Sequence, residues 1–397
     1  MKTGERTIYF DNAASSFPKP EAVINATADF LRTAGNPGRG AHGFALDGAR
    51  RIFEARDKVA EFLGVKQAER LVFTPGCTAS LNMALKGFAA AGGLSQGDVV
   101  IVSSFEHNSM MRPIAQLVES IGISYVVCPV TETFESDFQQ LVELHKPKLV
   151  ALSWASNVTG EVLPISSLSK VLRSKQIPLI VDAAQTAGKF AVNLDDSGIS
   201  FFCASGHKGL MGAPGVGVLY VAPDAPIVPL IAGGTGSRSE SLAVPTEFPD
   251  RLEAGTLPGP AIAALAAGVH WLKTEGINTG LKAELYLTER FLFWAKGQSY
   301  IKVFGSDKVR PEKGVPVRMP VVSFSMDGIS PSLLADRLDT EYGIAVRAGL
   351  HCAPLCHEQL GTIGEGLVRV SFGVFNVGNE VEALISALEA IHAGLRV

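Results

Sequence analysis

The feature that most constrains how this chain folds is an alternation of short apolar runs with stretches of helical spacing. The apolar runs lie at residues 71–73, 99–103, 124–128, 149–153, 178–182, 201–203 and 216–221. Helical stretches separate several of these runs and lie at residues 78–90, 108–121, 135–144 and 165–174. Strands that are covered on both faces are apolar throughout, and helices between them are typical of βαβ units. The sequence therefore predicts an α/β fold with a mainly parallel sheet between helices.

The flanking parts of the chain predict an extended arm and a second group of elements. Pro18 and Pro20 end the arm, and helical patterns follow at residues 21–34 and 45–63. Residues 233–260 are rich in Gly and Pro, and a connection of this length is usually functional or joins two domains. Further helical or strand patterns lie at residues 260–298, 319–325, 331–339, 343–347, 367–371 and 378–394.

Composition and charge are those of an ordinary globular protein. Of the 397 residues, 47% are hydrophobic and 19% are charged. A net charge of −4 offers no basic surface to nucleic acid or to an anionic membrane. Prolines interrupt the most apolar stretch, residues 215–234, so it predicts a buried strand and a loop. The N-terminus has no apolar signal core and the cysteines number five, which favours the reducing cytoplasm over a disulfide framework.

Polar and reactive side chains follow five of the predicted strands, at the point where each strand ends. In an open parallel sheet, ligands bind outside the carboxyl ends of the strands, so we expect these side chains to converge on one rim. The groups are residues 74–78, residues 105–108, Asn157 with Thr159, Asp182 with Gln185, and residues 205–208. Together they suit an aromatic, phosphorylated and charged ligand.

Lys208 and Asp182 predict that this ligand is pyridoxal phosphate (PLP). PLP needs a lysine for its covalent link and an acid beside its pyridinium nitrogen. Asp182 closes an apolar strand, where a carboxylate is costly unless a cation pairs with it; the alternative is that it caps the next helix. Lysine is rarely buried unless it is paired or functional, and the alternative for Lys208 is an exposed turn.

A phosphate group has candidate partners at two of the strand ends. The segment Gly76-Cys77-Thr78 opens a helix and offers backbone N–H groups and a hydroxyl. Ser205 and His207 stand beside Lys208 and can donate to the same anion. His107 can stack on the cofactor ring, or it can cap the helix that starts at residue 108.

Several short motifs carry a resemblance to a known family. They are FDNAAS (10–15), EHNS (106–109), SNVTG (156–160), VDAAQ (181–185), SGHKGLMGAPGVG (205–217), EAGT (253–256) and RAGLHCAP (347–354). In this order and spacing, from about residue 8 to the C-terminus, they resemble class V aminotransferase-fold enzymes, and within them the cysteine desulfurase and selenocysteine lyase group. The resemblance implies the PLP-dependent transferase fold type I, with a mainly parallel seven-stranded sheet, a smaller α+β C-terminal domain and a homodimer with shared active sites.

The resemblance also implies a division of the chain. We expect residues 1–20 to form an arm that packs with the small domain, and residues 21–260 to form the large PLP-binding domain. Residues 261–397 would then supply a connecting helix and the small C-terminal domain that carries the loop of Cys352.

The resemblance implies a role for each candidate residue. Lys208 would bind the cofactor and move protons at the substrate Cα, and His107 would stack on the ring. Asp182 would pair with the pyridine nitrogen, and Gln185 would reach the ring hydroxyl. The phosphate would be held by Gly76, Cys77, Thr78, Ser205 and His207, and by Thr256 of the partner subunit. The substrate would be met by Arg369, which holds its carboxylate through a bidentate fork, and by Asn157, His42, Arg39 and Arg347. Asn157 would also assist near the cofactor ring.

Cys352 is expected to decide the reaction. Its thiolate would attack the sulfur of L-cysteine, leaving L-alanine and a persulfide on Cys352. Nearby cations favour a thiolate, and Arg347 and His351 are close in sequence. RAGLHCAPL predicts a loop, which suits a mobile sulfur carrier; the alternative is a buried structural cysteine.

Other functions stay open on the same motifs. The first is a cysteine desulfurase that supplies iron–sulfur cluster assembly or thiolation through an acceptor protein. The second is a lyase that cleaves selenocysteine or cystine, and the third is a non-catalytic PLP-fold binding protein.

Cys77 stands where the family often has threonine. Cys352, Cys356 and the histidines beside them superficially resemble a metal site, but no second ligand pair accompanies them, so no metal is expected.

Overall fold

The computed structural model describes residues 7–38, 40–238, 240–309 and 316–395. The chain forms two compact units. The smaller unit comprises residues 1–18, 155–163 and 278–397, and the larger unit comprises residues 19–154 and 164–277. The domain boundaries expected from the sequence stay a prediction. Arg39 lies outside the described residues.

The larger unit is built on one seven-stranded sheet in the order β2-β8-β7-β6-β5-β3-β4. Its strands are β2 (Leu71–Thr74), β3 (Val99–Ser103), β4 (Ser124–Cys128), β5 (Leu149–Ser153), β6 (Leu179–Asp182), β7 (Phe201–Ser205) and β8 (Gly217–Val221). β8 runs antiparallel to both of its neighbours, and the other pairs are parallel. The predicted mainly parallel sheet is therefore confirmed.

The strands form because their side chains are buried on both faces. Every residue of β5 is buried, and Leu149 to Leu152 are fully inaccessible. An uninterrupted apolar run of this kind is the pattern of a central parallel strand. One face of the sheet contributes to a hydrophobic cluster, to which α3 adds Leu81 and Leu85 and β7 adds Phe201.

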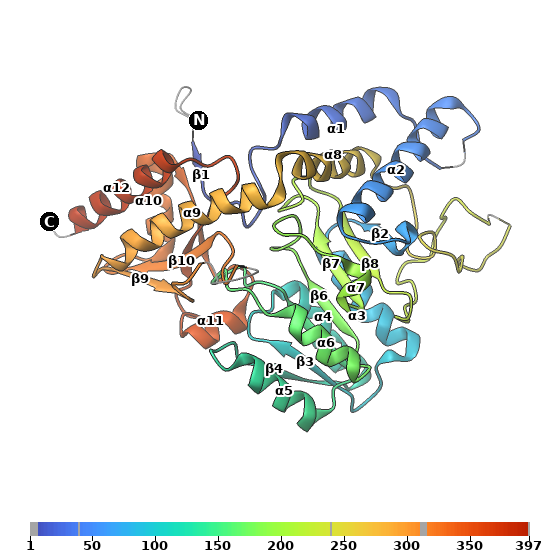
Figure 1. Ribbon diagram of the computed structural model, residues 1–397, viewed down its shortest axis with the longest axis horizontal. Coiled ribbons are helices and arrows are strands. Elements are labelled where there is room, and N and C mark those ends of the chain that lie inside the picture. The colour runs from blue at the N-terminus through green and yellow to red at the C-terminus, as the bar shows by residue number, and fades with distance from the viewer. Residues whose placement is uncertain (1–6, 39, 239, 310–315, 396–397) are drawn as a thin grey trace. The chain divides into compact units, whose positions relative to one another are not determined.

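The helices of the larger unit flank this sheet or pack on one another (Figure 1). They are α1 (Glu21–Thr33), α2 (Gly43–Phe62), α3 (Cys77–Phe88), α4 (Asn108–Ile121), α5 (Phe134–His145), α6 (Ile165–Ser174), α7 (Leu194–Ser197) and α8 (Gly259–Glu275), with short turns η1 (Ala68–Arg70) and η2 (Ala89–Gly93). α3 packs on β7 and β8, and α8 lies beside α1 and α2 (Figure 1). α4 buries Met110, Ile114 and Leu117, the i, i+4 and i+7 spacing of an apolar helix face.

The smaller unit combines a four-stranded antiparallel sheet, in the order β12-β13-β10-β9, with a pair of short strands, β1 and β11. Its strands are β1 (Ile8–Tyr9), β9 (Ile301–Phe304), β10 (Val321–Met326), β11 (Ile344–Ala345), β12 (Arg347–Gly349) and β13 (Leu367–Ser371). Its helices are α9 (Ile277–Lys296), which begins in the last residue of the larger unit, α10 (Pro331–Tyr342), α11 (Pro354–Leu360) and α12 (Gly378–Leu395). β1 pairs in parallel with β11, which ties the N-terminal arm to this unit.

Two features differ from the sequence prediction. The strand expected at 343–347 is two strands, β11 and β12, separated by Val346. The segment RAGLHCAPL begins as β12 and ends as the first turn of α11, with the loop limited to residues 350–353. Pro354 starts α11 because the first helical position needs no backbone N–H.

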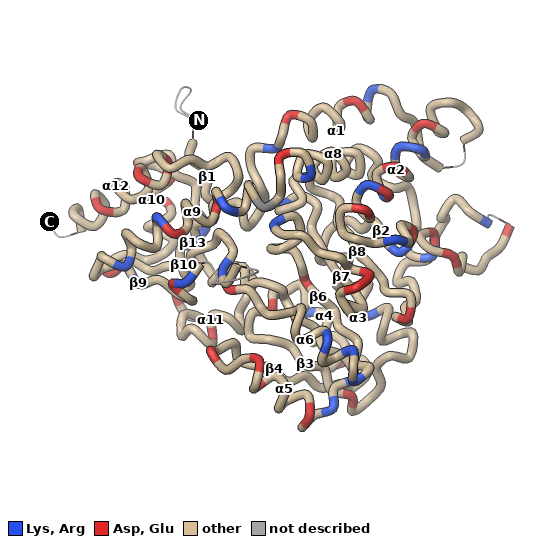
Figure 2. The backbone as a smooth tube through the Cα atoms, viewed as in Figure 1, with Lys and Arg blue, Asp and Glu red and all other residues tan. Residues whose placement is uncertain are grey.

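The surface charges are mixed rather than gathered by sign. Figure 2 shows acidic and basic residues interspersed along α1 and α2, and Asp47 of α2 forms ion pairs with both Arg50 and Arg51. Within the described part of the chain, no helix combines the length and the apolar character needed to cross a bilayer.

Candidate active site

The strand ends of the larger unit bring Asp182 and Lys208 to the same edge of the sheet. Asp182 is the last residue of β6 and pairs in register with Cys203 of β7. β7 ends at Ser205, so Lys208 follows only three residues beyond the neighbouring strand. Parallel strands end at one edge, which is where the sequence pattern predicted a ligand.

Asp182 lies in a dry environment beside a thiol. Its side chain accepts from the backbone N–H of Ala184 at 2.9 Å and from Cys77 Sγ at 3.4 Å, and the residue is 6% exposed. Burial and the carboxylate of Asp182 raise the pKa of the Cys77 thiol well above its usual range, while Lys208 opposes the rise. Asp182 and Lys208 therefore both influence the pKa of the buried Cys77 thiol, which stays protonated and donates a hydrogen bond to Asp182.

The N-terminus of α3 is open to an anion. Gly76 is the residue before the helix and, having no side chain, makes no side-chain hydrogen bond to the first turn. A Cβ placed on Gly76 would meet nothing within 4 Å, so there is free space beside this backbone. The uncapped N–H groups and the helix dipole both favour a negative group at this point.

His107 and Thr78 are linked through Ser109. Thr78 Oγ1 lies 2.8 Å from Ser109 Oγ, which lies 2.9 Å from His107 Nδ1. His107 also caps α4, because its Nδ1 accepts from the backbone N–H of Ser109 at 3.0 Å. The alternative that His107 caps this helix is thus observed.

Lys19 is a residue of this site that the sequence reasoning missed. Its Nζ donates to the backbone oxygen of His207 at 2.7 Å, next to Lys208. Burial lowers the pKa of Lys19 to about 8. Burial, followed by the charges of Lys208 and Lys19, lowers the pKa of His207 to about 4, so His207 is a neutral donor at pH 7. In the sequence, Lys19 is marked only by the prolines on either side of it at the end of the arm, and that pattern carries no chemical signal.

Glu106 is a second buried group that the sequence reasoning left without a role. It is fully buried after β3, and both of its oxygens accept from the backbone N–H of Ser153 at 2.9 Å. Oε1 also accepts from Ser103 Oγ at 2.5 Å. Burial raises the pKa of Glu106 to about 7 against these hydrogen bonds. Glu106 ties the ends of β3 and β5 together just before His107.

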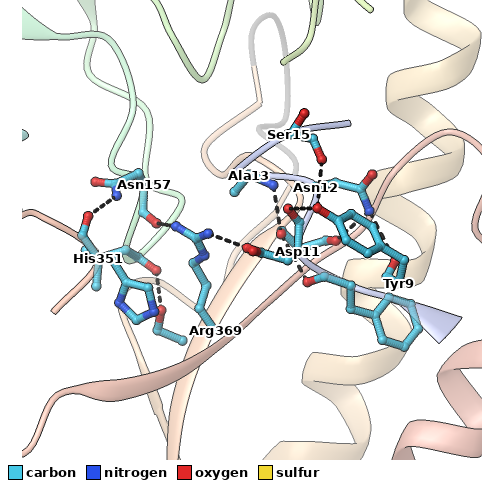
Figure 3. Close-up of polar contacts among 12 residues, drawn as sticks. Tyr9, Asp11, Asn12, Ala13, Ser15, Asn157, His351 and Arg369 are labelled. Carbon is cyan, nitrogen blue, oxygen red and sulfur yellow. Dashed lines mark hydrogen bonds and ion pairs between the residues drawn. The ribbon is translucent and has the colours of Figure 1, made fainter. Parts of the chain in front are cut away.

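In the smaller unit, Arg369 lies at the centre of a polar cluster (Figure 3). Arg369 is 2% exposed. Its Nη2 donates to Asp11 Oδ1 at 2.6 Å, and its Nη1 donates to the backbone oxygen of Asn157 at 3.0 Å. The Nδ2 of Asn157 donates in turn to the backbone oxygen of His351 at 2.7 Å. The structure thus brings Arg369, Asn157 and the Cys352 turn together within one unit.

Cys352 is exposed on a strained turn. His351 and Cys352 have φ angles of 51° and 58°, in the left-handed region that residues with a Cβ seldom adopt. Strain of this kind is concentrated at functional sites. The neighbours His351 and Ala353 are 5% and 0% exposed, so the turn is anchored on both sides of the thiol. All five cysteines are free thiols, and Cys356 is buried.

The expectation that His351 supplies a positive charge to Cys352 is wrong. Burial, and then the charge of Arg369, lowers the pKa of His351 to about 3. Its ring stacks on that of His357, with centroids 5.8 Å apart. His351 is therefore a neutral, packed side chain at pH 7, and Arg347 is the cation that remains beside the turn.

The other predicted residues occupy mixed positions. Gln185 follows β6 and is half-buried, and Ser205 is buried at the end of β7. Thr256 is exposed in the long connection before α8. His42 is exposed and caps α2 through its Nδ1, which accepts from Ala45 N at 3.3 Å.

The model of one family, aminotransferase class-V, matches residues 8–384. The chain belongs to this family. It is 32% identical to the "Probable cysteine desulfurase" of Vibrio cholerae, over 97% of this chain and 93% of the relative. It is also 32% identical to the cysteine desulfurase CsdA of Escherichia coli, over 96% of this chain and 93% of CsdA.

Solved structures agree with this assignment. An apo cysteine desulfurase from Thermococcus onnurineus NA1 matches with a TM-score of 0.89 at 31% identity, over 98% of this chain and 95% of that one. CsdA from Escherichia coli matches with a TM-score of 0.84 at 30% identity, over 97% and 94%. The protein is therefore a PLP-dependent enzyme, as the sequence predicted.

The residues present fit PLP. The uncapped first turn of α3, with open space beside Gly76, suits the phosphate. Asp182 is a buried carboxylate and suits the protonated ring nitrogen. Lys208 supplies an amine at the same edge of the sheet. The donor set therefore matches the three charged or reactive points of the cofactor.

Proposed function

We propose that this enzyme is a cysteine desulfurase that converts L-cysteine to L-alanine and transfers the sulfur to Cys352. The observation that carries the proposal is the exposure of Cys352. It is the one exposed thiol among five cysteines, and it stands on a left-handed turn anchored by buried neighbours. A structural cysteine has no need of exposure, whereas a sulfur acceptor must reach both substrate and recipient.

The larger unit would hold the cofactor. Bound PLP supplies an electron sink for the bonds at the substrate Cα. Lys208 would hold PLP and move the proton at that carbon. Asp182 would keep the ring nitrogen protonated, helped by the donor Cys77, and His107 would stack on the ring. Gln185 would meet the ring hydroxyl.

The phosphate would be held from two sides of the same edge. Its partners would be Gly76, Cys77, Thr78, Ser205 and His207, together with Thr256 of the partner subunit. Backbone N–H groups at a helix start bind phosphate through both their hydrogen atoms and the helix dipole.

Arg369 would bind the substrate carboxylate, with Arg347, Asn157, His42 and Arg39 on the substrate side. A guanidinium carries five N–H donors, and Arg369 uses two of them in the hydrogen bonds described. Its Nε is buried and has no partner among the described residues. A buried donor without an acceptor is costly, and a carboxylate would satisfy it.

The sulfur step balances without an external oxidant. The Sγ of Cys352 attacks the sulfur of L-cysteine, the substrate C–S bond breaks, and a new S–S bond forms. The substrate Cβ takes up a proton, so that L-cysteine and the thiol of Cys352 become L-alanine and a persulfide. An acceptor protein would then remove the sulfur, for iron–sulfur cluster assembly or thiolation.

The proposal is tested by the variant Cys352→Ser. The visible spectrum of bound PLP should persist. Alanine formation from L-cysteine, with dithiothreitol present to reduce the persulfide, should fall by at least about two orders of magnitude, because the nucleophile is lost. Cys128→Ala, which removes a buried thiol at the end of β4, should keep its activity. Full activity of Cys352→Ser on L-cysteine refutes the proposal. Activity of that variant on L-selenocysteine or L-cystine alone would indicate a lyase, and protein that takes up no PLP would indicate a binding protein.

We also propose a homodimer in the cytoplasm. Phe44 and Phe53 of α2 and Leu31 of α1 are 66%, 65% and 69% exposed, and large apolar side chains of this kind favour a partner surface. Five unpaired cysteines suit a reducing compartment. Light scattering of the purified protein should give twice the chain mass of 41.9 kDa; a monomer would contradict the dimer.

A further inference from the structure

Arg369 forms an ion pair with Asp11, a residue that has no proposed role in binding the cofactor or the substrate. The two side chains meet at 2.6 Å, and they are 20% and 3% exposed respectively. Asp11 comes from the N-terminal arm and Arg369 from β13, at opposite ends of the sequence. Figure 3 shows the carboxylate of Asp11 pointing at the guanidinium from the side opposite to Asn157.

The backbone of the arm holds Asp11 in this position. β1 pairs with β11, and Asp11 continues the arm as a parallel bridge to Ser371 of β13. The N–H of Ala13 donates to Ser371 Oγ at 2.9 Å. The hydroxyl of Tyr9 donates to the backbone oxygens of Asp11 and Ser15, each at 3.1 Å. Asp11 is therefore placed by backbone pairing rather than by its contact with Arg369.

The guanidinium of Arg369 needs such an anchor. A long arginine side chain has many rotamers, and a carboxylate ligand requires one of them. Arg369 also faces Arg347, its register partner across β12 and β13. Like charges directly opposite on two strands repel each other, which would turn the two guanidinium groups apart. Asp11 draws Nη2 to one side, and the backbone oxygen of Asn157 draws Nη1 to the other.

We propose that Asp11 is a positioning residue of the substrate-carboxylate site, which holds the guanidinium of Arg369 in the orientation that binds the substrate. The inference rests on the proposed role of Arg369. Two arginines and one aspartate leave one net positive charge, which matches one α-carboxylate. Asp11 does not touch the substrate; it acts through Arg369.

The inference is tested with Asp11→Ala and Asp11→Asn. In Asp11→Ala, the KM for L-cysteine should rise at least about tenfold, the loss expected for one charge-assisted hydrogen bond, with a smaller fall in kcat. Asparagine at position 11 keeps an oxygen that can accept a hydrogen bond from Nη2 of Arg369. Loss of the negative charge of Asp11 does not weaken the attraction of Arg369 for the substrate carboxylate. Asp11→Asn should therefore stay within about threefold of wild type. If it is as defective as Asp11→Ala, position is not what Asp11 supplies, and the inference is overturned.

Ligand binding separates a positioning role from a structural one. Titration calorimetry should show weaker binding of L-alanine to Asp11→Ala, and unchanged binding of L-alaninamide, which has no carboxylate. Equal weakening of both ligands would overturn the inference.

The matched control is Asn12→Ala. Asn12 fastens the same arm through its Nδ2, which donates to the backbone oxygen of Ser371 at 3.0 Å, but it does not touch Arg369. Asn12→Ala should lower the unfolding temperature and leave the KM within about threefold. If it reproduces the KM of Asp11→Ala, the arm as a whole is responsible and the inference fails.

The variant Arg369→Lys, measured in parallel, separates a failure of the proposed role of Arg369 from a failure of the proposed role of Asp11. A normal KM in Arg369→Lys overturns both the role of Arg369 and the inference built on it. A defective Arg369→Lys beside a normal Asp11→Ala overturns the inference alone.

Discussion

Replacing Glu253 with glutamine removes the counterion of a buried arginine. The two oxygens of Glu253 accept from Nη1 and Nη2 of Arg56, each at 2.7 Å, and Oε1 also accepts from the backbone N–H of Phe73 at 2.6 Å. The side chains of Arg56 and Glu253 are 8% and 4% exposed. Breaking a buried pair costs about 3–5 kcal/mol, because the remaining charge stays in a dry environment. We expect about 3 kcal/mol for Glu253→Gln, since the glutamine oxygen still accepts one hydrogen bond.

The free energy of unfolding is measured by urea titration followed by far-ultraviolet circular dichroism. The same connection before α8 offers a control pair, Arg238 and Glu247, whose side chains are each 55% exposed. Glu247→Gln should cost under about 1 kcal/mol, because water screens an exposed pair. The double variant Arg56→Met/Glu253→Gln should regain part of the loss, since no charge remains buried. A loss in Glu253→Gln no greater than that in Glu247→Gln refutes the reasoning.

Two further predictions use the same unfolding assay. Burial raises the pKa of Glu106 from 4.5 to about 7, so the folded state favours the protonated carboxyl group. The protonated Glu106 therefore contributes fully to the free energy of unfolding below pH 4.5, and this contribution is lost as the pH rises through about 7. At 1.36 kcal/mol per pKa unit, this contribution to the free energy of unfolding amounts to about 3 kcal/mol. In Glu106→Gln, the free energy of unfolding should therefore fall less steeply between pH 4.5 and 7 than in the wild type. The same pH dependence in both proteins would contradict the prediction. A Cβ on Gly217 would lie 2.5 Å from the backbone of Gly76, so Gly217→Ala should cost about 2 kcal/mol and weaken PLP binding. Gly43→Ala, whose Cβ meets nothing within 4 Å, should cost nothing; equal losses in the two would contradict the clash.

Local pattern alone predicted most of the elements. The apolar runs at 99–103, 124–128 and 149–153 coincide with β3, β4 and β5. The helical stretch at 108–121 coincides with α4. These segments are long, strongly periodic or apolar throughout, and burial on both sheet faces selects such sequences directly. The mainly parallel sheet then places the residues after each strand at one edge, which is why Asp182 and Lys208 could be paired before their geometry was known.

The class of fold, the family and the residues that follow the strands could thus be predicted before any coordinates. The contacts between distant segments became visible only in the folded chain: Lys19 with His207, and Asp11 with Arg369. The folded chain also leaves His351 neutral, because burial outweighs the proximity that the sequence suggested. Periodicity predicts which face of an element is buried, but it does not predict which polar side chain from a distant segment contacts that face. The charge state of a side chain depends on such contacts and on the removal of water, and both are properties of the folded chain.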